Sequence, residues 1–255
     1  MKERVISAII MILISVPFLI IGNIPFLIFV TILGNMALYE LLKLQKKIPI
    51  DIKIITHFLN TIIILKSLIK IKMELIIIIT ILLLLGMLVL KKDYHYKNAF
   101  LLIGMLLFIG IAFNNLITIR NRSLLEFIYI LIITVVTDTC ALLIGKKFGR
   151  HKLLERISPN KTIEGLIGGC LVGTILASIY NYLCLDIFPN LFIIIFITFL
   201  LSLIGEFGDL IKSSIKRQEK IKDFSNLIPG HGGILDRVDS LLFVSMIYIL
   251  IINLI

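Results

Sequence analysis

Cysteine is scarce in this chain of 255 residues, and the three that occur are widely spaced in apolar surroundings. Cys140, Cys170 and Cys184 form no C-x-x-C pair and have no histidine nearby at metal-ligand spacing, which argues against a disulfide framework and a zinc site. The chain also lacks internal repeats, Gly/Ser-rich linkers and low-complexity stretches beyond an Ile and Leu bias. We therefore expect a single domain over 1–255.

Acidic residues are outnumbered, 16 against 26 Lys and Arg, which gives a net charge of +10. A basic chain can bind nucleic acid, but this one has no soluble basic domain, no recognition motif and no basic patch interleaved with exposed aromatics. We therefore expect no nucleic-acid partner. The positive charge has a simpler explanation in membrane topology and in attraction to anionic lipid head groups.

Long apolar runs dominate the chain, which is 59% hydrophobic with a mean hydropathy of +1.08. Runs of about 18 to 22 residues are long enough to cross about 30 Å of hydrocarbon. The first run, 5–21, follows Lys2 and Arg4 as in a signal peptide, but no A-x-A-like cleavage site follows it, so we expect a retained helix. The composition predicts an integral protein of the lipid bilayer.

Cutting the sequence at its polar interruptions predicts an all-α polytopic membrane protein with about nine transmembrane helices. The predicted spans are 5–21, 25–42, 50–71, 73–90, 99–119, 124–145, 163–184, 189–211 and 238–255. The third is the weakest, because polar residues such as His57 and Lys66 interrupt it. We group the spans into N-terminal helices over 1–120 and a C-terminal group over 124–255 that carries most charged motifs.

Lys and Arg fall mostly on one side of these spans, 21 of the 26 on the side of the N-terminus and 5 on the other. The positive-inside rule counts these residues in short loops. We therefore expect the N-terminus and both long polar loops on the cytoplasmic side of the inner membrane, with the C-terminus on the opposite side.

Polar side chains recur on one helical face near the ends of three predicted spans. They are Thr134 and Asp138 in the sixth, Glu206, Asp209, Ser213 and Lys216 in the eighth, and Asp236 and Asp239 at the start of the ninth. Helix capping would explain a single such acid but not the set, since a charge at mid-depth costs at least about 2.5 kcal/mol. Converging carboxylates need a neutralising cation, and oxygen-only ligands beside phosphates indicate Mg²⁺.

The loop between the sixth and seventh spans is basic, and its end has the residues of an anion site. Ser158, Lys161 and Thr162 lead into a predicted helix start at 162–165, where phosphate contact is favoured. His231 lies between two glycines and could act as an acid or base, or equally brace the backbone. The other three histidines have no convincing partner in the sequence.

The stretch 213–239, SSIKRQEKIKDFSNLIPGHGGILDRVD, resembles the signature of the phosphatidate cytidylyltransferase (CDP-diacylglycerol synthase) family. It meets the pattern S-x-[apolar]-K-R-x4-K-D-x-[GSA]-x2-[LIF]-[PG]-x-H-G-G-[apolar]-x-D-R-[apolar]-D without a gap, including Lys216, Arg217, Lys222, Asp223, Ser225, His231, Asp236, Arg237 and Asp239. Blocks within 138–165 and 205–212, and the segment around Glu40, are also similar. The resemblance is weakest over 45–130, and departures at Cys140, Leu142 and Leu143 affect no catalytic position.

The resemblance implies an enzyme that makes CDP-diacylglycerol from CTP and phosphatidic acid with release of pyrophosphate. It also implies a possible homodimer and a metal centre at Asp209 and Asp236 that holds Mg²⁺ alongside a monovalent cation such as K⁺. We expect Lys222 and His231 to join these two acids as catalytic residues. The alternative metal ligands are Asp138, Asp223 and Asp239, and the expected phosphate clamps are Lys161, Lys216, Arg217, Lys222 and Arg237.

Two other functions remain open at this stage. A CTP-dependent polyprenol or phytol kinase resembles this family in its membrane fold and its nucleotide. An ion-coupled transporter would also carry buried carboxylates and glycine-interrupted helices, although the charges here gather on one face. A CDP-alcohol phosphotransferase is disfavoured, because the chain has no D-G-x2-A-R-type motif.

Overall fold

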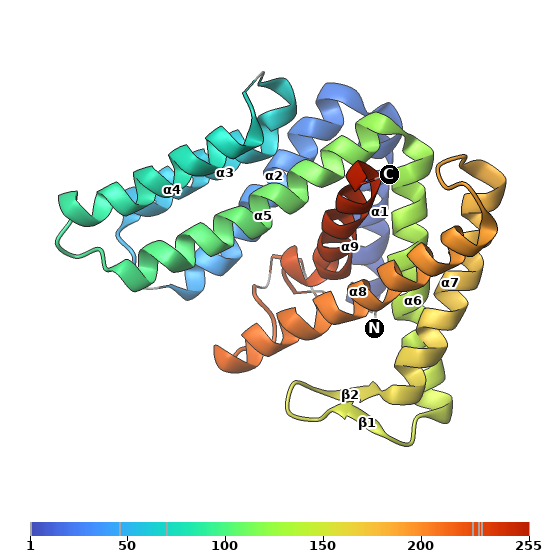
Figure 1. Cartoon of the computed structure of the whole chain (residues 1–255). Helices are drawn as coiled ribbons and strands as arrows, with labels where there is room; N and C mark the ends of the chain where they lie inside the picture. The colour runs from blue at the N-terminus through green and yellow to red at the C-terminus, as the bar shows by residue number, and fades with distance from the viewer. Residues whose placement is uncertain are drawn as a thin grey trace. The chain divides into compact units, whose positions relative to one another are not determined.

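The computed structural model describes residues 2–45, 47–69, 71–225, 227–228, 230 and 232–254. Helices account for most of this part of the chain (Figure 1). The elements are α1 (Lys2–Ile21), α2 (Asn23–Leu44), α3 (Ile50–Ile64), the 3-10 helix η1 (Leu65–Leu68), α4 (Met73–Leu90), α5 (Tyr96–Arg122), α6 (Leu124–Phe148), β1 (Lys152–Leu154), β2 (Ser158–Thr162), α7 (Ile163–Cys184), α8 (Leu191–Gln218) and α9 (Leu235–Leu254). The predicted all-α polytopic class is confirmed.

Six of these helices are long and apolar enough to cross a bilayer: α2, α4, α5, α6, α7 and α8. The apolar part of α1, Ile6–Ile21, is shorter. Our third predicted span, 50–71, is not one continuous helix, because α3 ends at Ile64 and η1 follows it. At 1.5 Å per residue α3 is about 22 Å long, less than the hydrocarbon thickness. A total of nine spans stays a prediction.

The chain divides into two compact units by the contacts between its residues, while the single membrane domain over 1–255 stays a prediction. Unit 1 comprises 1–121 and the later segment 223–237, and unit 2 comprises 122–222 and 238–255. The 223–237 segment, which the sequence groups with the C-terminal helices, is therefore part of the N-terminal unit.

In unit 1, α2, α3 and α5 pack closely where their residues are small. A Cβ at Gly34 of α2 would lie 2.5 Å from Ile64 Cδ1, and one at Gly110 of α5 would lie 2.7 Å from Ile63 Cγ2. Asn114 of α5 also donates to the Ile64 carbonyl at 2.9 Å, at the end of α3. Small residues let helix backbones approach in this way inside a membrane.

Unit 2 is built on α6, α7, α8 and α9, again with glycines at the crossings. A Cβ at Gly169 of α7 would lie 2.7 Å from Ala141 Cβ of α6, and one at Gly208 of α8 would lie 2.5 Å from Phe243 Cδ2 of α9. A buried hydrogen bond of 2.7 Å joins Tyr129 of α6 to Thr198 of α8. This packing holds α8 against the part of α9 that belongs to unit 2. The polar residues of these two helices within unit 2 are therefore held close together.

A two-stranded antiparallel hairpin, β1 and β2, connects α6 to α7 (Figure 1). The predicted helix start after it is confirmed, since the Thr162 hydroxyl accepts from the Gly165 amide at 3.1 Å as the N-cap of α7. Glu164 accepts from the Arg150 amide at 3.1 Å and lies 2.6 Å from His151 Nδ1. His151, for which the sequence suggested no partner, therefore has one in the first turn of α7.

Candidate active site

Lysines and carboxylates alternate in a cluster at the ends of β2, α8 and α9 in unit 2. Lys161 Nζ lies 2.7 Å from Glu206 Oε2 and 2.6 Å from Asp209 Oδ2. Lys212 Nζ lies 3.1 Å from Asp209 Oδ1 and also pairs with Asp239. We call these five residues the lysine-carboxylate cluster. It brings together Lys161, Asp209 and Asp239, three of the residues predicted from sequence.

Burial makes this cluster electrostatically strong. The Glu206 side chain is 1% exposed and that of Lys212 is 9% exposed. Burial by itself lowers the pKa of the Lys161 ammonium, but Asp209 and Glu206 outweigh this effect and raise its pKa above the ordinary value. Lys161 therefore carries its positive charge at any physiological pH.

Asp138 of α6 adds a further carboxyl group to the same region. Its Oδ2 accepts from the Ser240 hydroxyl at 3.2 Å, and it interacts electrostatically with Glu206, Asp209 and Asp239. With all groups ionised, the four acids would outnumber Lys161 and Lys212 by two charges. One divalent cation would neutralise that excess, as would two bound protons.

The donor set of the cluster fits a hard divalent cation in its chemistry, because every candidate ligand is a carboxylate oxygen. Glu206 Oε1 is buried and has no hydrogen-bond partner in the part of the chain that the structure describes, so this oxygen could accept a proton or a cation. Among the residues that the structure describes, no group of three or more His, Cys, Asp and Glu side chains could hold a metal ion by itself. Lys161 and Lys212 each bridge two acids of the cluster.

Unit 1 holds the 223–237 segment, in which Asp236 accepts from backbone amides. Asp236, 6% exposed, accepts through Oδ2 from the Phe224 and Gly233 amides, both at 3.0 Å. An isolated bridge between Ile228 and Gly232 closes the turn that precedes α9. A Cβ at Gly232, where φ is +87°, would lie 3.3 Å from Asp223. The same Cβ would lie 3.0 Å from Asp236 Oδ2, so Asp223 and Asp236 are both close to this glycine.

Glu40 of α2 is fully buried and binds the same segment. Its Oε1 accepts from the Ser225 hydroxyl at 2.6 Å and from the Ile234 amide at 2.8 Å, and its Oε2 accepts from the Leu235 amide at 3.0 Å. The segment is therefore attached to α2 through one carboxylate.

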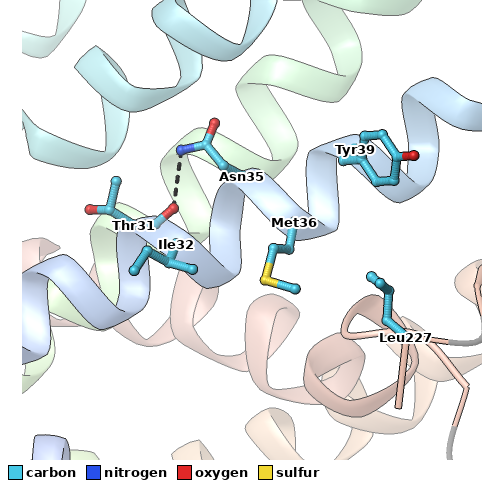
Figure 2. Close-up of a pocket in the computed structure, with 6 residues that line it drawn as sticks. All are labelled: Thr31, Ile32, Asn35, Met36, Tyr39 and Leu227. Atoms are coloured by element: carbon cyan, nitrogen blue, oxygen red, sulfur yellow. Dashed lines mark hydrogen bonds between the residues drawn. The ribbon is translucent and has the colours of Figure 1, made fainter. Parts of the chain in front are cut away.

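An apolar cavity of about 490 Å³ lies beside this attachment (Figure 2). Figure 2 shows α2 forming one wall, from Thr31 to Tyr39, with Leu227 of the 223–237 segment facing Met36 across the opening. The Asn35 side chain turns back along α2 and donates to the Thr31 carbonyl at 3.0 Å, so it adds little polarity to the cavity.

The remaining predicted residues have separate places. Arg217 Nε donates to the Ile157 carbonyl of the hairpin turn at 3.2 Å, so this predicted phosphate clamp also holds the hairpin to α8. Ser158 and Thr162 lie at the two ends of β2. Lys222, Asp223 and Arg237 are exposed, and Lys216 is half-buried. His231 lies outside the described residues.

Sequence reasoning gave no role to two residues that organise these sites, Lys212 and Glu40. Lys212 lies three positions after Asp209 on α8, a spacing at which helical side chains meet. Glu40 is an acid within the predicted span 25–42. A charge inside the bilayer is costly in free energy, so an acid at this position indicates a structural or functional role. Their partners in α9 and in the 223–237 segment could not be read from spacing.

Comparison with known proteins gives matches over nearly the whole chain. The model of a family described as the cytidylyltransferase family matches residues 2–255. A phosphatidate cytidylyltransferase of Bacillus subtilis strain 168 is 34% identical over 255 residues, covering 96% of this chain and 94% of the relative. Phosphatidate cytidylyltransferases of Staphylococcus haemolyticus and Staphylococcus aureus strain COL are 34% and 35% identical over 250 residues, each covering 96% of both chains.

Proposed function

Because the chain belongs to the cytidylyltransferase family, we propose that it transfers the CMP moiety of CTP to phosphatidic acid, giving CDP-diacylglycerol and pyrophosphate. The single observation that carries this proposal is similarity over 96% of the chain to enzymes named for this activity. The lysine-carboxylate cluster supports it independently, because buried charges of both signs suit the handling of phosphates and a cation.

The reaction is an in-line displacement at phosphorus. An oxygen of the phosphatidate phosphate forms a bond to the α-phosphorus of CTP, and the bond from that phosphorus to the bridging oxygen of the β-phosphate breaks. Pyrophosphate leaves with the bonding electron pair. No covalent enzyme intermediate is needed, so the protein contributes positioning and charge neutralisation.

The lysines of the cluster are suited to exchange partners during this reaction. Lys161 and Lys212 each contact two acids, Lys161 meeting Glu206 and Asp209 and Lys212 meeting Asp209 and Asp239. Phosphate oxygens would compete with these acids for the ammonium groups, since both are charged oxygen acceptors. Lys216, Arg217, Lys222 and Arg237 would add positive charge around the triphosphate.

Asp209 and Asp236 are the ligands that we propose for Mg²⁺, with Asp239, Asp138 and Asp223 as alternatives. When bound, the ion would neutralise charge on the triphosphate and on the departing pyrophosphate. α9 carries Asp236 in its first turn and Asp239 three residues later, so this helix contributes acids to both units. A K⁺ ion beside Mg²⁺ is part of the same proposal and rests on the family resemblance.

We also propose a cytoplasmic active site and N-terminus, a C-terminus on the opposite side, and a homodimer. The sidedness rests on the excess of Lys and Arg in the polar loops. Labelling of single cysteines introduced at each end of the chain, in intact cells, tests it. The homodimer rests on the resemblance, and the mass of the detergent-solubilised protein by light scattering tests it.

The test of the function is incubation of the purified protein with phosphatidic acid, CTP labelled in the cytidine, and Mg²⁺. We expect a labelled liponucleotide that disappears when EDTA is added. Phosphorylation of polyprenol or phytol from γ-labelled CTP, without a liponucleotide, would instead establish a lipid kinase. Ion flux into proteoliposomes without CTP would support a transporter and contradict the proposal.

A further inference from the structure

The end of α2 carries a buried carboxylate whose partners all come from the 223–237 segment. Glu40 is 0% exposed and accepts three hydrogen bonds, from the Ser225 hydroxyl and from the Ile234 and Leu235 amides. Buried carboxylates are costly unless fully hydrogen-bonded. This side chain therefore binds the segment firmly, across 185 to 195 residues of sequence.

These hydrogen bonds determine what the start of α9 can bind. The first amides of a helix are unsatisfied within the helix and attract anions. Here Glu40 takes the amides of Ile234 and Leu235, and Asp236 takes that of Gly233. The protein's own carboxylates thus occupy three consecutive amides at the entry to α9, which fixes the backbone immediately before Asp236.

Two neighbouring contacts show how closely the segment fits Glu40. A Cβ added at Gly233 would lie 2.5 Å from Glu40 Oε2 and 2.6 Å from Oε1, so only glycine leaves room for the carboxylate. Ser225, besides donating to Glu40, accepts from the Leu227 amide at 3.3 Å. The anchor therefore extends from α2 through Ser225 to the residue that faces the apolar cavity.

We propose that Glu40 is a positioning residue, which anchors the 223–237 segment on α2 and thereby holds Asp236 in the orientation that the cation and nucleotide require. The inference rests on the proposed function for its catalytic consequence. Its structural part, the anchor itself, can be measured without any substrate. Glu40 touches no reacting atom in this account and acts through Asp236.

Substitutions at Glu40 give a graded test, because the number of acceptors can be changed in steps. Glu40→Gln keeps one oxygen for Ser225 and Ile234 but presents an NH₂ group to the Leu235 amide, while Glu40→Ala removes all three bonds. We expect exchange of the 232–240 amides with deuterium to become about tenfold faster in Glu40→Ala and less so in Glu40→Gln. We expect the Mg²⁺ concentration for half-maximal activity to rise about 10- to 100-fold in Glu40→Ala.

Glu126→Gln is the matched control. Glu126 of α6 is also buried and accepts from Tyr248 at 3.0 Å and Arg122 at 3.2 Å, but its partners lie outside the 223–237 segment. This substitution should leave both the 232–240 exchange and the Mg²⁺ dependence unchanged, whatever it does to stability. A rise in the Mg²⁺ requirement in both variants would mean that loss of any buried acid has this effect, and would overturn the inference.

A double substitution tests the contact between Glu40 and Gly233 directly. Gly233→Ala alone should raise the Mg²⁺ requirement, because its methyl group displaces the carboxylate. In a Glu40→Ala background the collision is absent, so the double variant should behave like Glu40→Ala. Independent, multiplying effects of the two substitutions would contradict the anchor.

The outcomes separate this inference from the proposed function. An inactive wild-type protein would refute the proposed function, and the exchange measurement would still decide whether Glu40 anchors the segment. An active wild type with unchanged exchange and unchanged Mg²⁺ dependence in Glu40→Ala would overturn the inference and leave the proposed function standing.

Discussion

The two units both bury carboxylates, but they satisfy them in different ways. In unit 1, Asp236 and Glu40 accept from backbone amides of one short segment. In unit 2, the acids of the lysine-carboxylate cluster pair with the ammonium groups of Lys161 and Lys212. Backbone amides cannot leave their positions without unfolding the segment, whereas lysine side chains can turn to other anions.

We propose that this difference gives the two groups of acids separate tasks. The amide-bound acids fix the shape of a loop and the start of α9, so their contribution is to geometry. The lysine-bound acids form an exchangeable set, in which an ammonium group released by a carboxylate can bind a phosphate. Nucleotidyl transfer needs both fixed geometry and exchangeable charges, because the substrate must be held precisely and its negative charge must be neutralised.

The largest expected effect is the loss of activity on substitution of Asp209 or Asp236, and the stability of the two variants distinguishes the two acids. We expect Asp209→Asn and Asp236→Asn each to lower CDP-diacylglycerol formation at least about 10²- to 10³-fold, as loss of a group that meets transition-state charge does. Asp236→Asn should also lower the free energy of unfolding by about 1–3 kcal/mol, because two buried amides lose a charged acceptor. Activity assays and thermal unfolding in detergent measure the two effects. Equal stability of both variants would remove the distinction drawn between the units.

Removal of Lys161 is expected to have the next largest effect. Lys161→Gln leaves Glu206 and Asp209 without their shared cation, and we expect an activity loss of about 10²-fold from misplaced carboxylates. Lys146→Gln is the matched control, since Lys146 is an exposed lysine on α6 close to the same hairpin. We expect it to retain wild-type turnover. Comparable losses in both variants would point to the general positive charge of the loop rather than to the cluster.

Glu206→Gln should have a smaller and more specific effect. Glu206 Oε1 is a buried oxygen with no hydrogen-bond partner among the described residues, and a neutral amide removes one negative charge from the cluster. We expect the Mg²⁺ concentration for half-maximal activity to rise about tenfold while turnover at saturating Mg²⁺ changes little. A fall in turnover at all Mg²⁺ concentrations would show that Glu206 acts on the substrate and not on the cation.

The smallest effects concern packing and not charge. Gly208→Ala in unit 2 places a methyl group 2.5 Å from the Phe243 ring, and we expect a loss of stability of about 1–3 kcal/mol. Gly86→Ala on α4 of unit 1 meets no atom within 4 Å, and should be neutral or stabilising by up to about 1 kcal/mol. Thermal unfolding of both variants checks this pair. A stable Gly208→Ala would mean that α8 and α9 pack less closely than described.

Much of the fold could be predicted from hydropathy and capping, because these signals are local. The helix start at Thr162 followed from its side chain and the residues around it. The end of α3 at Ile64 could not be predicted in this way, since the following residues, 65–72, contain no glycine or proline to mark the end of a helix. The hairpin of β1 and β2 was expected only as a basic loop.

The candidate site was partly predictable for the same reason. Asp209, Asp236 and Asp239 stand out as acids at the ends of apolar spans; the family signature contains Asp236 and Asp239, and Asp209 lies in the similar block 205–212. Lys212 and Glu40 gained their importance from partners in other elements, in the case of Glu40 as many as 195 residues away. Contacts between residues so far apart cannot be predicted from a single sequence. Whether Asp209 and Asp236 share one ion stays a prediction, as do the roles of the phosphate clamps.

The central proposal is that Asp209 and Asp236 hold one cation against CTP, and Mn²⁺ binding measured by electron paramagnetic resonance tests it most directly. The wild-type protein should bind Mn²⁺ more tightly in the presence of CTP. Asp209→Asn and Asp236→Asn should each abolish that CTP-dependent binding, and the double variant should be no worse than either. Full CTP-dependent binding in one single variant, or the loss of separate fractions of Mn²⁺ in the two, would contradict a shared centre.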